Sequence, residues 1–376
     1  MSIVPAELSD YIIDFLHKDA RTLASCARVS RTWTPAARFH LFRTIVLQNE
    51  RFTSAFTRLL SSSPELGHYV RELTVAKLVS SPDVFRAAKP LASPLAGALP
   101  RILAHLPHLR SLTLAHMELK NTNDLGALRH TRVTALTLSY CQFAEFADIV
   151  ELVHSFPRLA TLALAGLTWT EESRVPQVQA IPSLKQLVLG RESDATRLFE
   201  WFVAAGFHET VERLSARCAS ERDTDLVGPF LKLAGPGLRE LELDWSFSGD
   251  KTIALPPTFT LAECTSLQRL HLQFPIHYST RLPWVVDLLQ TLSDASALRA
   301  LAFEIRLVGG VDALDWGALA GVLTTSEACR TLEQFDVRVN LWPGVHRSLG
   351  EVEGIVREAL RPIEERGLVR FGKISA

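Results

Sequence analysis

The hexapeptide LRSLTL at residues 109–114 sets the pattern that most of this chain follows. On an extended backbone Leu112 and Leu114 point to one side, while Ser111 and Thr113 point to the other. Related segments stand at 133–138 (VTALTL), 159–164 (LATLAL), 184–189 (LKQLVL), 238–243 (LRELEL), 267–272 (LQRLHL) and 298–303 (LRALAF). A half-apolar strand that recurs in this way predicts a solenoid, in which neighbouring units cover one another's apolar faces.

The units can be counted by the central apolar residue of each match. These residues are Ile45, Leu73, Leu112, Leu136, Leu162, Leu187, Leu214, Leu241, Leu270, Leu301 and Phe335. From Leu112 to Leu301 they lie 24 to 31 residues apart, close to the length of a leucine-rich repeat. That length leaves room for a return helix. We therefore expect an α/β leucine-rich-repeat domain over residues 42–376, with parallel strands on the concave face and helices outside.

Three segments or positions depart from the repeat pattern and predict local features of the structure. Residues 77–98 are rich in Pro, Ala and Ser, which predicts an inserted surface loop. Residues 348–364 place apolar side chains on one helical face, which predicts a capping helix, and LVRF from Leu368 predicts a weak final strand. The asparagine or cysteine that follows the strand in many leucine-rich repeats is clear only at Cys141, so we expect irregular curvature.

Composition and charge argue against several classes of partner. Lys and Arg number 40 and Asp and Glu 41, so no positive excess favours nucleic acid or an anionic membrane. No apolar run approaches the roughly 20 residues that span a bilayer. Glu7, Asp10 and Asp14 interrupt the segment that would be apolar in a signal peptide. We expect an intracellular protein, cytoplasmic and/or nuclear, with neither nucleic acid nor membrane as a partner.

Residues 1–41 follow a different pattern, that of a small helical domain. Leu8, Ile12 and Leu16 fall at i, i+4 and i+8, with Tyr11 and Phe15 beside them, as in an amphipathic helix. Asp19 is placed to cap a second helix that carries Leu23 and Cys26, and Val29 and Trp33 belong to a short third element. Three short helices make a thin core, so part of this apolar surface is expected to bind a partner.

The segments VPAELSDYIIDFL (4–16) and LASCARVSRTW (23–33) resemble an F-box, whose pattern is LPxELxxxIxxxL followed by a VCR-like triplet and a tryptophan. The matching residues are Pro5, Glu7, Leu8, Ile12, Leu16, Leu23, Val29, Arg31 and Trp33. Val4 and Ser30 replace the usual leucine and cysteine. The chain is similar in style to the divergent F-box proteins of mushroom-forming fungi, in which leucine-rich repeats follow the box.

This resemblance implies the substrate-recognition subunit of a Skp/cullin/F-box ubiquitin ligase. In that family the F-box binds a Skp-type linker subunit, and the repeats bind the protein to be ubiquitylated. Linker binding is carried over to Pro5, Leu8, Ile12, Leu16, Val29 and Trp33. For Leu16, Val29 and Trp33 an equally weighted alternative is that they form the core of the helical domain.

A change in character along the predicted concave face suggests where a substrate protein binds. The outward positions of the early units are small and uncharged, such as Thr113, Ala135 and Thr161. From Leu214 onward the charges alternate in sign, which suits specific protein recognition. The predicted substrate-binding residues are Arg213, Arg217, Glu240, Glu242, Asp244, Arg269, His271, Asp336 and Arg338. The alternative is a solvated strand face without a ligand.

No catalytic or metal-binding pattern stands out. The sequence lacks GxSxG, HExxH and a GxxxxGK followed by Ser or Thr, and its five cysteines include no CxxC, so we expect no catalytic residues, no metal and no cofactor. Arg217 beside Cys218 is the one feature that could activate a thiol, and no partner base accompanies it. The sequence predicts a non-catalytic ligase adaptor; the alternative is a leucine-rich-repeat scaffold or enzyme regulator outside the ubiquitin system.

Overall fold

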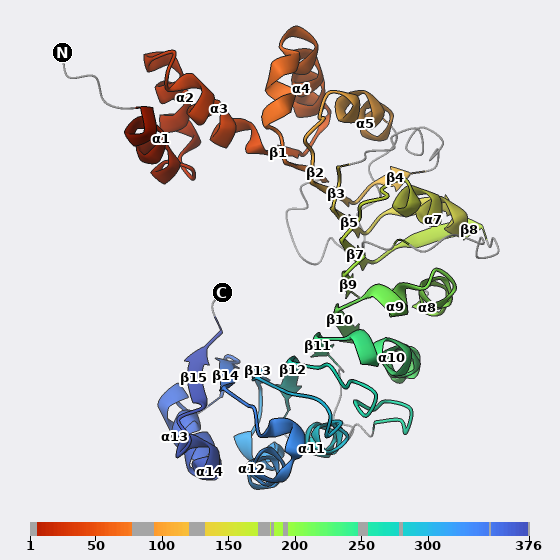
Figure 1. Ribbon diagram of the computed structural model, residues 1–376, viewed down its shortest axis with the longest axis vertical. Helices are drawn as coiled ribbons and strands as arrows, with labels where there is room; N and C mark the ends of the chain where they lie inside the picture. The colour runs from red at the N-terminus through yellow and green to blue at the C-terminus, as the bar shows by residue number, and fades with distance from the viewer. Residues whose placement is uncertain are drawn as a thin grey trace. The chain divides into compact units, whose positions relative to one another are not determined.

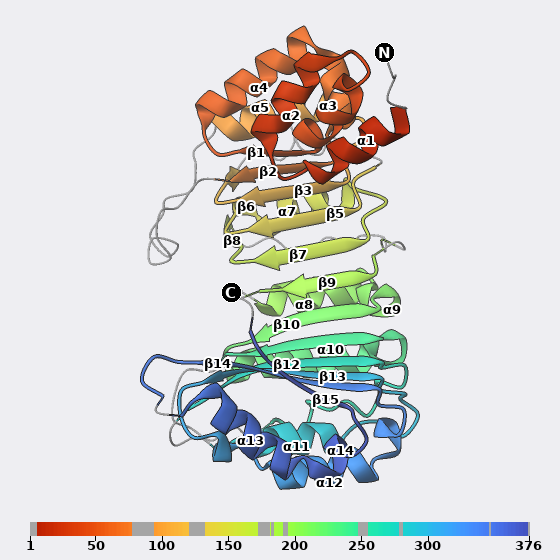
Figure 2. The ribbon, with the colours of Figure 1, turned by 90° about the vertical axis from the view of Figure 1, so that its left-hand side faces the viewer.

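The computed structural model describes residues 6–76, 94–119, 132–171, 181, 184–190, 195–246, 255–277, 281–345 and 347–374. The chain divides into two compact units, Met1–Pro176 (unit 1) and Gln177–Ala376 (unit 2). In each unit parallel strands lie side by side, and the helices that connect them lie on one side of the strands (Figures 1 and 2). The predicted α/β leucine-rich-repeat fold is therefore confirmed.

Unit 1 opens with the helical domain and continues with the first repeats. The helical domain comprises α1 (Ala6–Phe15), α2 (Ala20–Val29) and α3 (Thr34–Arg43). The main sheet has the order β1 (Thr44–Leu47), β2 (Glu72–Ala76), β3 (Ser111–Ala115), β5 (Ala135–Ser139) and β7 (Thr161–Ala165). The connections contain α4 (Glu50–Ser62), the 3-10 helix η1 (Pro64–Tyr69), α5 (Pro94–Ala104) and α7 (Phe146–His154).

Unit 2 carries the remaining repeats. Its strands are β9 (Gln186–Leu189), β10 (Arg213–Cys218), β11 (Glu240–Trp245), β12 (Arg269–Ile276), β13 (Ala300–Leu307), β14 (Gln334–Leu341) and β15 (Val369–Lys373). Its helices are α8 (Ala195–Ala204), α9 (Phe207–Thr210), α10 (Glu221–Ala234), α11 (Pro283–Gln290), α12 (Trp316–Thr325), α13 (Leu349–Ala359) and α14 (Arg361–Glu364), with short 3-10 turns at Gly235–Gly237, Val311–Ala313 and Glu327–Cys329.

The strand register follows the repeat that the sequence predicts. In unit 1 the register partners are Ile45, Leu73, Leu112, Leu136 and Leu162, in that order. In unit 2 they are Leu187, Leu214, Leu241, Leu270, Leu301, Phe335 and Val369. Each of the eleven central residues thus lies in a strand. A slip of one residue would turn this apolar row to the solvent side, which is why the register is so strongly specified.

Aromatic side chains fill the space between the strands and helices of unit 2. Trp245 and Trp284 stack with their ring centroids 4.4 Å apart, and Phe274 meets Trp284 edge to face. Phe303 continues this cluster to Phe335 through ring contacts at 5.1 Å. Edge-to-face and offset-stacked pairs of this kind add to the free energy of burying the rings.

Two local features differ from the sequence prediction. The predicted loop at 77–98 is in part helical, because α5 begins at Pro94; residues 77–93 lie outside the described residues. A second parallel sheet, β4 (Glu118–Leu119), β6 (Gln142–Glu145) and β8 (Thr168–Glu171), occupies the start of three return segments. The apolar alternation there is too short to be recognised as a strand in the sequence.

The C-terminal end of unit 2 is covered by α13, α14 and β15. A capping box starts α13, with Ser348 and Glu351 each bonding the other's backbone N–H. The inner side of this helical segment is fully buried, at Val352, Val356, Leu360 and Ile363. Within the described residues, no helix combines the length and the apolar character needed to cross a membrane.

Candidate protein-binding surfaces

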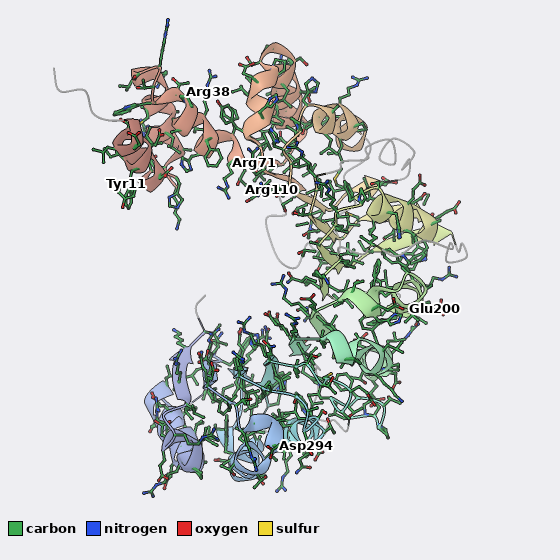
Figure 3. All side chains as sticks on the ribbon, viewed as in Figure 1. Tyr11, Arg38, Arg71, Arg110, Glu200 and Asp294 are labelled. Carbon is green, nitrogen blue, oxygen red and sulfur yellow. The ribbon has the colours of Figure 1, made fainter. Side chains whose placement is uncertain are left out.

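The first helix presents apolar side chains to solvent. Leu8, Tyr11, Ile12 and Phe15 are 54, 62, 52 and 68% exposed, and we call them the apolar face of α1. They fall at i, i+3, i+4 and i+7, so they lie together on one side of the helix. Tyr11 and Phe15 meet edge to face at 4.9 Å. Figure 3 shows Tyr11 pointing away from α2 and α3.

The core of the helical domain uses the other side of α1. Ile13 is fully buried together with Leu23, Cys26 and Ala37. Ile13 was not singled out in the sequence, because the F-box pattern emphasises its neighbour Ile12. The core is small, so burying the apolar face of α1 as well would need a further surface.

The other predicted linker-binding residues divide between core and surface. Leu16 and Trp33 are partly buried and pack against the core cluster, so they contribute to the domain's own packing. Val29 is 68% exposed at the end of α2. Pro5 lies outside the described residues.

Polar contacts cap α2 and link α1 to α3. Asp19 caps α2 by accepting from the backbone N–H groups of Arg21 and Thr22 and from the Thr22 hydroxyl at 2.6 Å. These hydrogen bonds hold the pKa of the Asp19 carboxyl below its usual value. His40 Nε2 on α3 lies 2.7 Å from Asp14 Oδ1 on α1. The apolar face of α1 is therefore presented by a fixed scaffold.

The predicted substrate-binding residues of unit 2 all lie on the strand side that faces away from the helices. Three register rows cross β10, β11 and β12: Arg213–Glu240–Arg269, Ser215–Glu242–His271 and Arg217–Asp244–Gln273. Asp336 and Arg338 stand two strands further on, in the rows of His271 and Gln273. We call this surface the mixed-charge face.

Most charges on the mixed-charge face are paired within it. Arg269 forms an ion pair with Glu240, and Arg217 Nε lies 3.4 Å from Asp244 Oδ2. Arg338 lies 3.3 Å from Asp336, whose Oδ1 also accepts from Gln334 at 2.7 Å. Exposed ion pairs contribute little to the free energy of folding, so these pairs determine the charge pattern of the surface more than they stabilise the fold.

His271 stands between two carboxylates. Its Nδ1 lies 3.6 Å from Glu242 Oε1, and its Nε2 lies 3.6 Å from Glu304 Oε2. That Nε2 is buried and has no hydrogen-bond partner among the residues that the structure describes. Gln273 holds Glu242 in place by donating to it at 2.6 Å. Glu304 and Gln273 therefore belong with the predicted binding residues.

A hollow of about 260 Å³ opens in the middle of the mixed-charge face. Short side chains line it at Ser215 on β10 and at Ala300 and Ala302 on β13, beside the longer Arg269 and His271 on β12. The predicted residues that line it are Arg213, Glu240, Glu242, Arg269, His271 and Arg338. The structure thus brings six of the nine into one depression; Arg217, Asp244 and Asp336 lie around it. Trp245, which adjoins them in sequence, is instead buried in the core.

The cysteines are all buried and free. Burial raises the pKa of the Cys141 and Cys264 thiols to about 12, and that of Cys218 is raised by burial and then by Asp223 and Asp244. The adjacent Arg217 therefore does not activate Cys218. Within the described part of the chain, no three His, Cys, Asp or Glu residues are grouped as a metal site would need.

No protein-family model and no curated protein matches the sequence. The fold is similar to that of the leucine-rich repeat-containing protein LegL7 from Legionella pneumophila, with 15% identity, a TM-score of 0.42, and 85% of this chain and 98% of that chain covered. It is similar to a chain of the yeast Rad7 and Elc1 complex, with 14% identity, a TM-score of 0.36 and coverage of 91% and 90%. It is also similar to a chain of the TLR13–ssRNA13 complex, with 13% identity, a TM-score of 0.33, and 82% of this chain and 46% of that chain covered.

The class of protein follows from the strand register and the repeat length. This chain is a leucine-rich-repeat solenoid protein that begins with a three-helix domain.

Proposed function

We propose that this protein is the substrate-recognition subunit of a Skp/cullin/F-box ubiquitin ligase. The helical domain binds a Skp-type linker subunit, and the mixed-charge face binds the target protein. The protein acts as an adaptor in the cytoplasm and/or nucleus and has no catalytic step of its own.

The apolar face of α1 is the observation that carries the proposal. Four large apolar side chains, each more than half exposed, lie together on a helix whose opposite side already packs in the core. A contiguous patch of this kind is unusual on a monomeric surface and typical of a docking helix. Leu8 and Ile12 are also residues through which the F-box resemblance implies linker binding.

The mixed-charge face supports the second half of the proposal. Its hollow gives the surface a defined shape, and its charges alternate in sign. Both properties allow a surface to discriminate between partner proteins. The hollow is open to one side and lined by both signs of charge, which suits a protein surface more than a single small ion.

Binding of the purified full-length chain to a purified Skp-type linker tests the first half. We expect the wild-type chain to bind and the Leu8→Asp plus Ile12→Asp variant to bind at least about a hundredfold more weakly, because two charges would be buried in an apolar interface. Phe52→Asp is the matched control, since Phe52 is 54% exposed on α4, outside the helical domain.

Absence of wild-type binding, or equal binding by the double variant, would refute linker docking. That result would favour the alternative, a leucine-rich-repeat scaffold or enzyme regulator outside the ubiquitin system.

A further inference from the structure

Unit 1 carries a row of arginines at the edge where its strands begin. The backbone N–H of Arg71 donates to the carbonyl of Arg43, and that of Arg110 donates to the carbonyl of Arg71, both at 2.8 Å. The N–H of Thr134, two residues after Arg132, continues the ladder to Arg110 at 2.8 Å. We call Arg43, Arg71, Arg110 and Arg132 the arginine edge. Neighbouring strands are about 4.8 Å apart, so these like charges are held close together.

The arginine edge lacks the internal pairing found in unit 2. Arg71 donates to the carbonyls of His68 and Val70 at 2.6 and 3.2 Å, and the Arg43 guanidinium lies 5.5 Å from the Phe39 ring centroid. Arg132 Nη1 lies 2.5 Å from His108 Nδ1. Among the described residues, none of these four arginines forms an ion pair with a carboxylate, whereas Arg217, Arg269 and Arg338 each do.

The acidic residue nearest in sequence forms no ion pair with these arginines among the described residues. Glu72 follows Arg71 directly, but its carboxylate accepts from the Thr44 hydroxyl at 3.1 Å on the neighbouring strand. Figure 3 shows Arg71 and Arg110 next to each other at β2 and β3. The edge therefore holds several guanidinium groups close together that no carboxylate of the described residues pairs with.

The electrostatic consequences can be seen in two side chains. The pKa of Arg71 is lowered, first by partial burial and then by Arg110, Arg43 and Arg132. The pKa of His108 is lowered by desolvation and then by Arg132, Arg71, His68 and Arg110. The rings of His68 and His108 lie 5.6 Å apart. An anion bound here would relieve this repulsion, which makes the edge favourable for negative ligands.

The strand surface beside the edge indicates the kind of anion. Beyond the first register row, Glu72–Ser111–Ala135, the strands carry a second row of outward positions, Thr74–Thr113–Thr137, which offers hydroxyl groups. The threonine positions supply no aromatic ring on which a nucleobase could stack. Guanidinium groups bind planar carboxylates through paired hydrogen bonds.

We propose that the arginine edge binds an acidic segment of a partner protein, through guanidinium–carboxylate pairs. The surface is additional to the apolar face of α1 and to the mixed-charge face, and its ligand does not depend on linker binding. An extended peptide that crosses the strands at this edge would place Glu or Asp side chains on successive arginines.

Titration of the full chain with a fluorescent, end-capped peptide of alternating Glu and Ser tests the proposal. We expect saturable binding that weakens as salt is added, and at least about tenfold weaker binding of the same peptide with Gln in place of Glu. The Arg43→Gln plus Arg110→Gln variant should bind the Glu peptide at least about tenfold more weakly. Arg71 is left unchanged because it also bonds the turn carbonyls.

The matched control removes the same charge from unit 2. Arg299 and Arg330 are exposed and paired with Glu333 and Glu327, and Arg299→Gln plus Arg330→Gln should leave peptide binding unchanged. The Leu8→Asp plus Ile12→Asp variant should also bind the peptide normally, which separates this surface from the proposed linker site. In NMR titrations the pKa of His108 should rise when the Glu peptide binds.

Several results would overturn the proposal. These are equal binding of the Gln peptide, an equal loss in the Arg299 and Arg330 control, an unshifted His108 titration, or tighter binding of a uridine oligonucleotide than of the Glu peptide. The last result would identify the edge as a nucleic-acid surface.

Discussion

Two adjacent isoleucines on α1 provide a direct test of how the helical domain is built. Ile12 is 52% exposed and Ile13 is fully buried, so the same change to alanine should destabilise the domain at Ile13 and hardly affect its stability at Ile12. Ile13→Ala removes buried methyl and methylene groups from a core of few side chains and leaves a cavity. We expect a loss of about 3 kcal/mol in the free energy of unfolding of the domain.

Ile12→Ala should leave stability almost unchanged. About half of the Ile12 side chain is already in water, so the lost transfer free energy is about 1 kcal/mol. Alanine has the higher helix propensity, which offsets about 0.5 kcal/mol of that loss. The net effect of Ile12→Ala is within about 0.5 kcal/mol, several times smaller than that of Ile13→Ala.

Hydrogen exchange followed by mass spectrometry in the full-length chain measures both effects. The amides of α1, α2 and α3 should exchange much faster in Ile13→Ala and at the wild-type rate in Ile12→Ala, while peptides from unit 2 report no change in either variant. Equal acceleration in the two variants would refute the division of α1 into a core side and a docking side. Linker binding should be weakened in Ile12→Ala without any loss of protection.

Further predictions concern the repeats. Gly166→Ala should destabilise unit 1 by about 2 kcal/mol in urea unfolding, because Gly166 has a φ of +63° and an added Cβ would lie 2.5 Å from Tyr140 Cδ1. Gly350→Ala should be neutral or slightly stabilising, because no atom of the described neighbouring residues lies within 4 Å of the added Cβ. The pKa of Cys141 is about 12 in the folded chain against an ordinary 9.0, so an unfolded thiol ionises first and stability should fall as pH rises from 9 towards 12, less steeply in Cys141→Ala. Charge reversal at Glu242, Arg269 and Asp336 should reduce recovery of bound target proteins from cell extract, and unchanged recovery would contradict a binding role for the mixed-charge face.

The sequence alone determined the repeat architecture of this protein. Strand positions and register followed from the spacing of residues such as Leu112, Leu214 and Leu301, because alternation along a strand and covering of its apolar side are local requirements. The charged strand positions of unit 2 could be named for the same reason. A residue two positions from a buried strand leucine points to the same side as that leucine, and its immediate neighbours point to the other.

Tertiary structure alone decided which residues share a surface and which are covered. Both Ile12 and Ile13 fit an apolar helix side, and only the packing of Leu23, Cys26 and Ala37 shows that Ile13 is the buried one. Likewise 28 residues separate Arg43 from Arg71, and 39 separate Arg71 from Arg110. Only the stacking of neighbouring repeats brings these arginines together. Contacts between distant segments depend on how the repeats pack, and spacing within a single repeat does not contain that information.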